Sequence, residues 1–330
     1  MRALGWSWPL LVAVVAASGC TCGKKSVDEA HATKGERAAK KLGAPRTLAS
    51  GLAQPWGIAL DGGHVYWSEK GTRKNDGVVA KVPKSGGAVV TIARDLSTPY
   101  GVAVDGARVY WTEYDSPQKL EIGTVKSAPL AGGPVTTLVP RTGMPWAIAV
   151  AGDDLFFTAL GDHAVLRGSS ERPGEAKVVA AAQQRPVGLA VDATSIYWTD
   201  TDGGFVLRAG RDGSPPALVA DGQKKPAGLA VDEGWIYWSC FESGEILRSA
   251  KSAGKPEVIA RAGPHPRGLA VDDAYVYFVA TQGGLVQRAP KTGGETETLA
   301  TQKAPYGLAV DASGVYWVDL DAGTVMAIDK

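Results

Sequence analysis

Histidine and carboxylate side chains are the groups in this sequence that could support acid–base or metal chemistry. His163 and His265 are expected in loops, and Glu69 and Glu113 each follow an aromatic triplet, Tyr-Trp-Ser or Tyr-Trp-Thr. Imidazole and carboxylate groups that meet in a cavity can hold a metal ion or transfer protons. A lone loop histidine is more often solvated, and an acid that recurs after the same triplet can instead accept hydrogen bonds from turn amides. Both interpretations stay open at this point.

The sequence lacks the residue spacing of several other catalytic sites. It contains no Ser-His-Asp set, cysteine-nucleophile motif, phosphate-binding loop or zinc spacing. Its three cysteines, Cys20, Cys22 and Cys240, do not form a disulfide framework. The 35 basic and 34 acidic residues nearly cancel, which gives no overall signal for nucleic-acid binding. We therefore expect no metal, no cofactor and no nucleic-acid partner.

The elements that must position these residues are copies of one repeat. Residues 186–200 begin with Pro-Val-Gly-Leu-Ala-Val-Asp and end with Tyr-Trp-Thr-Asp, and this unit occurs, lightly altered, in seven places. The spacing between copies is 39 to 46 residues, and they begin at Pro55, Pro99, Pro145, Pro186, Pro226, Pro266 and Pro305. A nearly constant period of this size indicates a repeat architecture.

Each copy contains four strand-like runs. In the fourth copy the apolar runs 188–191 and 196–199 have strand length and composition, and neither alternates cleanly, which favours strands covered on both faces. Turn residues separate these runs, and two further strand-like runs lie at 205–208 and 217–220. Four antiparallel strands in about 40 residues are typical of one propeller blade.

The two ends of the repeat region predict how a ring of blades closes. The last copy supplies three strands, and residues 46–50 (Arg-Thr-Leu-Ala-Ser) match the fourth-strand segment 297–301 (Glu-Thr-Leu-Ala-Thr). We therefore expect the N-terminal strand to complete the C-terminal blade, which removes free sheet edges. The predicted fold is all-β, a monomeric seven-bladed β-propeller of four-stranded antiparallel blades over residues 46–330.

The repeat resembles two known propeller families. The tetrapeptides at 197–200, 110–113 and 66–69 are similar to the YWTD repeat of low-density-lipoprotein-receptor-type propellers, and the Pro-x-Gly-Leu-Ala-Val-Asp opening resembles NHL-type repeats. The resemblance covers residues 46–330 and implies a propeller, but it implies no particular function, because propellers include binding scaffolds and enzymes. This chain departs from the receptor propellers, which have six blades, and its third copy reads Phe-Phe-Thr-Ala at 156–159.

The first 45 residues precede the repeat. Residues 1–19 contain Arg2, then an apolar core and then small residues, as in a signal peptide. The segment 17–20, Ala-Ser-Gly-Cys, resembles the bacterial lipoprotein processing site. That resemblance implies a membrane anchor through lipid on Cys20 and, in a Gram-negative cell, sorting to the outer membrane; an ordinary secretion signal is the alternative. Residues 20–45 have little apolar content and are predicted to be a flexible tether.

The residue between Pro and Gly of each copy, called residue x below, predicts a candidate site. Pseudo-symmetry places the seven x side chains in a ring at one mouth of the central channel, with four aromatic residues in consecutive copies. Such an arc can bind a ligand or partner, or it can simply fill the channel. The acids after the aromatic triplets are expected at the same end, as are two long loops at 70–76 and 114–122. The candidate binding residues are Trp56, Tyr100, Trp146, Tyr306, Arg267, Glu69 and Glu113.

Two functions of different classes are compatible with these features. Lactonase-like propellers bind calcium with two asparagines, so their site is not expected here, because the sequence has a single asparagine, Asn75. Lyase-type propellers use His and Glu near the mouth, which keeps a lyase or hydrolase with a metal-assisted site at the channel mouth as the alternative. Our preferred hypothesis is a lipid-anchored, non-catalytic propeller of the cell envelope that binds a protein, peptide or glycan.

Overall fold

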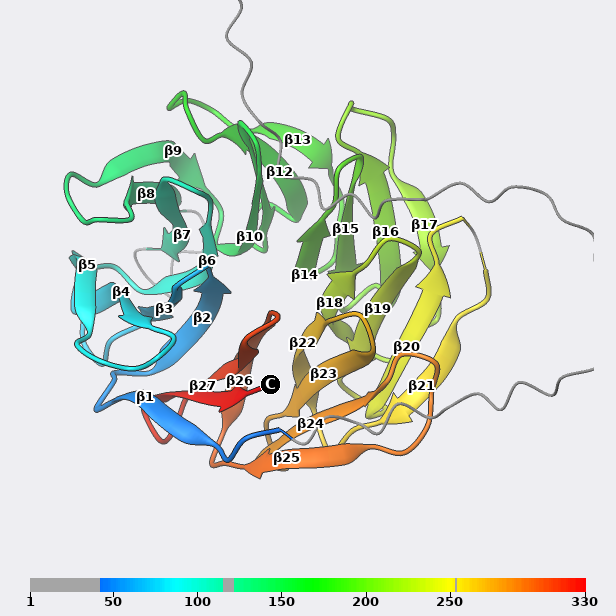
Figure 1. Ribbon diagram of the computed structural model, residues 1–330. Coiled ribbons are helices and arrows are strands. Elements are labelled where there is room, and N and C mark those ends of the chain that lie inside the picture. Colours follow the sequence, from blue (N-terminus) through cyan, green and yellow to red (C-terminus); the bar gives the residue numbers. More distant parts are fainter. Residues whose placement is uncertain (1–41, 115–121, 253) are drawn as a thin grey trace, which may run out of the picture. The chain divides into compact units, whose positions relative to one another are not determined.

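The computed structural model describes residues 42–114, 122–252 and 254–330 of the chain. In these ranges the secondary structure consists of strands β1 to β28, and none of the described segments is a helix that could span a membrane. The strands form seven four-stranded antiparallel sheets arranged as the blades of a propeller (Figure 1). The predicted all-β, seven-bladed fold is therefore confirmed. The predicted signal peptide, Cys20 and residues 21–41 of the predicted tether lie outside the described residues.

The first three blades each consist of four consecutive strands. Blade 1 contains β2 (Pro55–Leu60), β3 (His64–Glu69), β4 (Gly77–Pro83) and β5 (Val90–Leu96). Blade 2 contains β6 (Pro99–Val104), β7 (Arg108–Tyr114), β8 (Gly123–Pro129) and β9 (Thr136–Thr142). Blade 3 contains β10 (Pro145–Ala151), β11 (Asp154–Ala159), β12 (Ala164–Ser169) and β13 (Lys177–Ala180).

The next three blades follow the same pattern, and blade 7 combines both ends of the repeat region. Blade 4 contains β14 (Pro186–Val191), β15 (Ser195–Asp200), β16 (Phe205–Gly210) and β17 (Ala217–Ala220). Blade 5 contains β18 (Pro226–Val231), β19 (Trp235–Cys240), β20 (Glu245–Ala250) and β21 (Glu257–Arg261). Blade 6 contains β22 (Pro266–Val271), β23 (Tyr275–Ala280), β24 (Leu285–Pro290) and β25 (Glu297–Thr301). Blade 7 contains β26 (Pro305–Val310), β27 (Gly314–Asp319), β28 (Thr324–Asp329) and β1 (Arg46–Ser50).

Blade 7 closes the ring in the way that the sequence predicts. Its strand order is β1-β28-β27-β26, and Arg46 of β1 lies opposite Ala327 of β28. An ion pair of 2.7 Å between Arg46 and Asp329 supports this pairing. The last residues of the predicted tether also lie against this blade, because the Gly43 amide donates to the Asp329 carbonyl at 2.9 Å and Leu42 packs against the core. The expected closure by the N-terminal strand is confirmed.

The aromatic residues of each second strand fill the spaces between neighbouring blades. Tyr66 and Trp67 of β3 are fully buried on opposite faces of their sheet. Tyr66 packs with Trp111 of blade 2, whereas Trp67 packs with Tyr316 of blade 7. Successive residues of a strand point to opposite faces, so one Tyr-Trp pair contributes to both blade interfaces. The expected burial of these strands on both faces is therefore confirmed.

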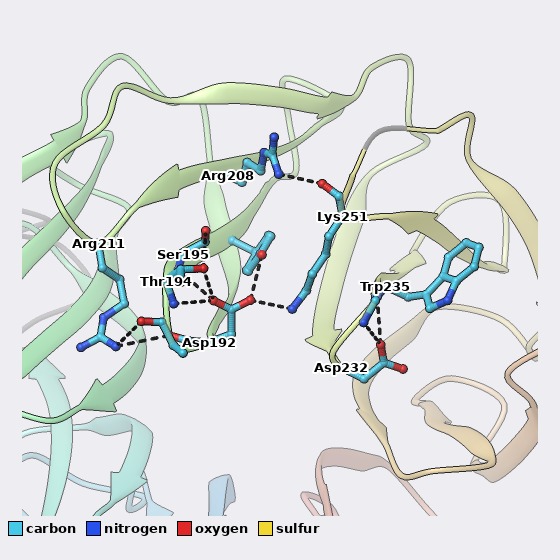
Figure 2. Close-up of polar contacts among 11 residues, drawn as sticks. Asp192, Thr194, Ser195, Arg208, Arg211, Asp232, Trp235 and Lys251 are labelled. Atoms are coloured by element: carbon cyan, nitrogen blue, oxygen red, sulfur yellow. Dashed lines mark hydrogen bonds and ion pairs between the residues drawn. The ribbon is translucent and has the colours of Figure 1, made fainter. Parts of the chain in front are cut away.

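Lysine–aspartate pairs join neighbouring blades on the face of the propeller opposite the Pro-x-Gly segments. In blade 4 the turn residue Asp192 accepts hydrogen bonds from the amides of Thr194 and Ser195 at 2.9 and 2.8 Å, and from Lys251 of blade 5 at 2.5 Å (Figure 2). Arg208 of blade 4 donates to the carbonyl of Lys251 at 2.7 Å, also drawn in Figure 2. Equivalent pairs join other blades: Lys291–Asp232, Lys330–Asp272 and Lys84–Asp311.

These bonds shift the acid–base properties of the groups that form them. Burial by itself would raise the pKa of Asp192, but the hydrogen bonds from Lys251 and from the two turn amides outweigh it and hold that pKa well below its usual range. The Tyr197 hydroxyl donates to the same carboxylate at 2.9 Å. Burial and this bond raise the pKa of Tyr197 to about 12. The tyrosine and the turn aspartate therefore form one hydrogen-bonded unit in blades 1, 2, 4, 5 and 6, whereas blade 3 has Phe156 in place of the tyrosine and Tyr316 of blade 7 pairs with Ser313.

Candidate functional site

The mouth of the channel is built by the Pro-x-Gly segment that begins each inner strand. Gly228 of blade 5 lies so close to blade 6 that a β-carbon there would stand 1.7 Å from the carbonyl oxygen of Arg267. The corresponding distance is 2.3 Å between Gly57 of blade 1 and the Tyr100 oxygen of blade 2. Only glycine allows such a close approach of two backbones. Each glycine therefore positions residue x of the next blade.

The serine or threonine of the aromatic triplet ties the same two backbones together. In blade 4 the Thr199 hydroxyl accepts a hydrogen bond from the Gly188 amide at 2.8 Å and donates to the Ala227 carbonyl of blade 5 at 2.8 Å. In blade 1 the Ser68 hydroxyl donates to the Tyr100 carbonyl of blade 2 at 2.5 Å. These bonds hold the ring of x residues in place before any ligand arrives.

The four predicted aromatic residues come together at the mouth. The ring centroid of Trp56 lies 3.9 Å from that of Tyr306, 5.3 Å from that of Tyr100 and 5.5 Å from that of Trp146. Tyr100 and Trp146 are stacked with their centroids 4.6 Å apart. The four rings, called the aromatic cluster below, thus pack on one another in the tilted and offset arrangements that aromatic pairs prefer. Their role in binding stays a prediction.

Two further residues, Tyr114 and Lys70, extend the aromatic cluster. Tyr114 stacks on Tyr100 at 5.0 Å, and their hydroxyl oxygens are 2.8 Å apart. Burial and this hydrogen bond raise the pKa of Tyr100. The Lys70 ammonium lies 4.0 Å from the centroid of the Trp56 ring, which is a cation–π contact, and burial lowers the pKa of Lys70. Lys70 begins the first of the two long loops expected at this end, whereas Tyr114, expected in the second loop, is the last residue of β7; residues 115–121 lie outside the described chain.

The two predicted acids are buried, and their oxygens are already hydrogen-bonded. Glu69 and Glu113 each accept a bond from the indole of the tryptophan two residues earlier, at 3.0 and 3.1 Å. Glu69 also accepts from the Ala53 amide at 2.8 Å, and Glu113 pairs with Lys126. This geometry matches the alternative stated above, in which each carboxylate accepts hydrogen bonds within its own blade and stabilises the blade and its loop. A direct role of Glu69 and Glu113 in binding stays a prediction.

A cavity of about 300 Å³ opens at the mouth over blades 4, 5 and 6 and is called the mouth cavity below. It lies where residue x is small, at Val187 and Ala227, next to Arg267. A second cavity of about 220 Å³ shares these three residues and continues into the channel along the glycines. The charged and aromatic residues that line the mouth cavity besides Arg267 are Arg185, Asp202, Lys225, Phe241, Glu242 and His265.

Arg267 connects the mouth cavity with the aromatic cluster. Its guanidinium carbon lies 4.6 Å from the centroid of the Phe241 ring and 5.3 Å from that of the Tyr306 ring, and it donates to the Tyr306 hydroxyl at 3.4 Å. Phe241 also stacks on His265, with centroids 4.1 Å apart and an interplanar angle of 13°. Burial raises the pKa of Tyr306, and the charges of Arg267 and Arg185 act against that rise. The side chains of His265, Phe241, Arg267 and Tyr306 therefore contact one another in sequence across the mouth.

The two histidines do not line the same cavity. His265 lines the mouth cavity, and its Nδ1 atom is buried without a hydrogen-bond partner in the described chain. His163 of blade 3 is exposed, and its Nδ1 atom lies 3.1 Å from the Gln183 carbonyl. Among the residues that the structure describes, no group of three or more His, Cys, Asp and Glu side chains could hold a metal ion. The described chain therefore supplies no ligand set for the metal-assisted alternative.

Six residues that line the mouth cavity were not predicted from the sequence, because the prediction used residue x alone; two of them, Thr201 and Asp202, come directly after β15. Arg185 and Lys225 each stand directly before the proline of a repeat. Phe241 and Glu242 come directly after β19, at the end of the aromatic tetrapeptide of blade 5. A comparison of these positions across the seven copies of the repeat, in addition to position x, would have identified these residues.

No protein-family model and no curated protein sequence matches this chain. Solved structures are similar to it in fold. A streptogramin B lyase structure aligns with a TM-score of 0.72 and 13% identity over 87% of this chain and 98% of that chain. Virginiamycin B lyase from Staphylococcus aureus aligns with a TM-score of 0.70 and 13% identity over 88% of this chain and 99% of that chain.

A chain of the nidogen–laminin complex, which contains a propeller of the YWTD type, aligns with a TM-score of 0.58. Its identity is 18% over 74% of this chain and 96% of that chain. Identities this low establish the fold and leave the function open. The chain is thus a β-propeller, similar over most of its length to bacterial lyases and, over a shorter part, to a YWTD-type propeller.

Proposed function

We propose that this protein is a binding propeller of the cell envelope. It holds a small ligand, or part of a protein, peptide or glycan partner, at the channel mouth. The observation that carries this proposal is the mouth cavity of about 300 Å³. Its size lies at the lower end of the range for small-molecule sites, which is about 300–1,000 Å³. Its lining combines three apolar side chains, Val187, Ala227 and Phe241, with five charged side chains, so it is more polar than most small-molecule pockets.

The rigid construction of the mouth supports a role in recognition. The Gly228 backbone is packed against Arg267 of the next blade, and the Thr199 hydroxyl bonds the Ala227 carbonyl beneath the cavity. Stacking fixes the orientation of Phe241 between its neighbours. A site that is already ordered loses less conformational entropy when a ligand binds.

Binding at this site is tested with a variant that fills the mouth cavity. Val187→Trp puts at position x of blade 4 the residue that blades 1 and 3 already carry there. The full-length protein is screened against small molecules, peptides and oligosaccharides by thermal shift, since a ligand that binds the folded state raises Tm. We expect hits that disappear in Val187→Trp and persist in the control Val178→Trp, which changes an exposed residue of β13. Hits that survive Val187→Trp would refute the proposed site.

We propose further that the lipoprotein-like segment 17–20 directs lipid to Cys20 and that the following residues link the propeller to the membrane. Two or more acyl chains give stable anchoring, whereas one chain does not. The expected result is that the protein sediments with membranes and that Cys20→Ala moves it to the soluble fraction. An unchanged distribution in Cys20→Ala would contradict the anchor and would leave the binding site unaffected.

A lyase is the second candidate, and one observation favours it. His265 lines the mouth cavity with an unpartnered Nδ1 atom, within the described chain, and Glu242 lines the same cavity. The structurally similar proteins include a catalytically inactive histidine-to-alanine variant of virginiamycin B lyase with quinupristin. Conversion of quinupristin by this protein, followed by mass spectrometry, would favour the lyase if His265→Ala abolished it and His163→Ala did not. Absence of conversion would leave the binding function.

A further inference from the structure

We infer that the mouth cavity selects ligands that carry one carboxylate on a flat apolar body, with Arg267 as the residue that binds the carboxylate. This inference rests on the proposed function, since it names the chemical class of the ligand at the same site. It depends on three features of the cavity: the stacked Arg267, the second guanidinium of Arg185, and the charge balance of the lining.

Arg267 has the geometry of a preorganised receptor for an oxyanion. Its guanidinium carbon lies 4.6 Å from the centroid of the Phe241 ring and 5.3 Å from that of the Tyr306 ring, so these two contacts restrict the movement of the guanidinium. One donor reaches the Tyr306 hydroxyl at 3.4 Å, and Arg267 forms no ion pair within the described chain. A guanidinium carries five N–H donors along its planar edge, and the Tyr306 hydroxyl is the only side-chain acceptor that Arg267 has within the described chain, so donors on that edge remain available to a ligand. A planar carboxylate matches such an edge with two parallel hydrogen bonds.

Arg185 supplies a second cation at the same cavity. It precedes β14 of blade 4, lines the mouth cavity and has no ion pair in the described residues. Arg185 and Arg267 line the same cavity, so both cations lie at one side of the mouth. Two guanidiniums that line one cavity, neither of them in an ion pair within the described chain, favour an anionic ligand.

The remaining charges favour a ligand with a single negative charge. Lys225 is engaged with Asp202 in an ion pair of 2.8 Å, and Glu242 is exposed. The lining therefore has three cationic and two acidic residues, which leaves one net positive charge. A carboxylate balances that charge, whereas a phosphate dianion would bring excess negative charge next to Glu242.

The apolar part of the cavity accounts for the body of the ligand. Val187 and Ala227 leave space where blades 1 and 3 have tryptophan. A cavity of about 300 Å³ is much larger than a carboxylate alone requires. Apolar side chains and an aromatic edge favour a flat hydrocarbon group in the remaining volume.

The test compares the affinities of two probes, 2-naphthoate and 2-naphthamide, which have different charges and nearly the same shape. Both affinities are measured by ligand-observed NMR titration of the full-length protein at neutral pH. We expect 2-naphthoate to bind at least about tenfold more tightly than the amide, as for a charge-assisted bond worth about 1.5–3 kcal/mol. Arg267→Lys keeps the charge but removes the planar edge, and it should weaken 2-naphthoate about tenfold. The control Arg94→Lys changes an exposed arginine of β5 and should leave both affinities unchanged.

Each other outcome has a defined meaning. Equal binding of both probes that is lost in Val187→Trp would overturn the carboxylate preference and leave the proposed binding site standing. Tighter binding of 2-naphthyl phosphate than of 2-naphthoate would overturn the choice of a monoanion. If neither probe binds, or if 2-naphthoate still binds to Val187→Trp, the inference is wrong, and the thermal-shift screen decides separately whether the mouth binds another ligand.

Discussion

Replacing Gly228 by alanine tests whether the close contact between inner strands holds the ring and the site together. The added β-carbon would stand 1.7 Å from the carbonyl oxygen of Arg267 and 3.2 Å from the hydroxyl oxygen of Ser239. The first distance is far below van der Waals contact, and the group that must move is backbone, which cannot rotate away as a side chain can. Blades 5 and 6 must therefore separate at the mouth, and Arg267 must shift with its strand.

Three contributions determine how this substitution changes the free energy of unfolding. Overpacking in a close-packed interior costs about 1–3 kcal/mol. The hydrogen bond from the Ser239 hydroxyl to the Arg267 carbonyl, at 3.2 Å, would be lost, at about 1 kcal/mol. Alanine in place of glycine returns about 0.4–1 kcal/mol through the unfolded state. We expect a net loss of about 2–3 kcal/mol, which for a domain of this size lowers Tm by roughly 4–9 °C.

The matched control is Ala147→Gly, because blade 3 already carries alanine at this position. Thr158 accepts a hydrogen bond from the Ala147 amide at 3.1 Å, but in the described chain it donates to no carbonyl of blade 4, so this boundary is less tightly tied. Ala147→Gly should cost no more than about 1 kcal/mol. Calorimetry of both variants checks the difference. Equal Tm values for Gly228→Ala, Ala147→Gly and the unsubstituted protein would refute the argument.

Three further predictions concern the blade interfaces. Lys251→Met removes the cation that binds Asp192 at 2.5 Å and should lower the free energy of unfolding in urea by about 1–2 kcal/mol; an unchanged urea midpoint would contradict a stabilising pair. The bonds from Lys251 and the turn amides lower the pKa of Asp192 despite its burial, so its contribution is complete above a pH of about 4 and is lost as the pH falls further. The stability difference between the unsubstituted protein and Asp192→Asn should therefore shrink between pH 6 and pH 2, and a constant difference would argue against this linkage. Burial raises the pKa of Cys240 to about 11, so in a variant without the other two cysteines a thiol reagent at pH 8 should react only as fast as the protein unfolds. Immediate reaction would show that the thiol is accessible.

The repeat made most of the fold readable from the sequence. Each copy contains its own turn signals and strands, so the number of blades follows from counting the prolines from Pro55 to Pro305. The match between residues 46–50 and 297–301 predicted that β1 pairs with β28, and the structure confirms this pairing. Such inferences succeed because each blade interacts mainly with its two neighbours, so the local pattern determines the global one.

The same pseudo-symmetry placed the x residues in a ring, and the structure brings Trp56, Tyr100, Trp146 and Tyr306 together there. The mouth cavity could not be predicted from the sequence, because an empty volume depends on two neighbouring blades having small x side chains and on which side chains reach in from the loops. The stacking of Arg267 on Phe241 and Tyr306 joins residues of blades 6, 5 and 7 that the period alone does not relate.

The sequence by itself thus determined the blade count, the closure of the ring and the end of the channel at which the x residues gather, since these depend on repeated local patterns. Only the tertiary structure determined which charged side chains remain available to bind a ligand. Glu69 and Glu113 face the expected end, yet indole, amide and lysine groups already bind their oxygens. Whether a charged side chain is neutralised or free depends on which groups the folded chain brings within hydrogen-bonding distance, and for these two acids those groups stand 2 to 16 residues away in the sequence.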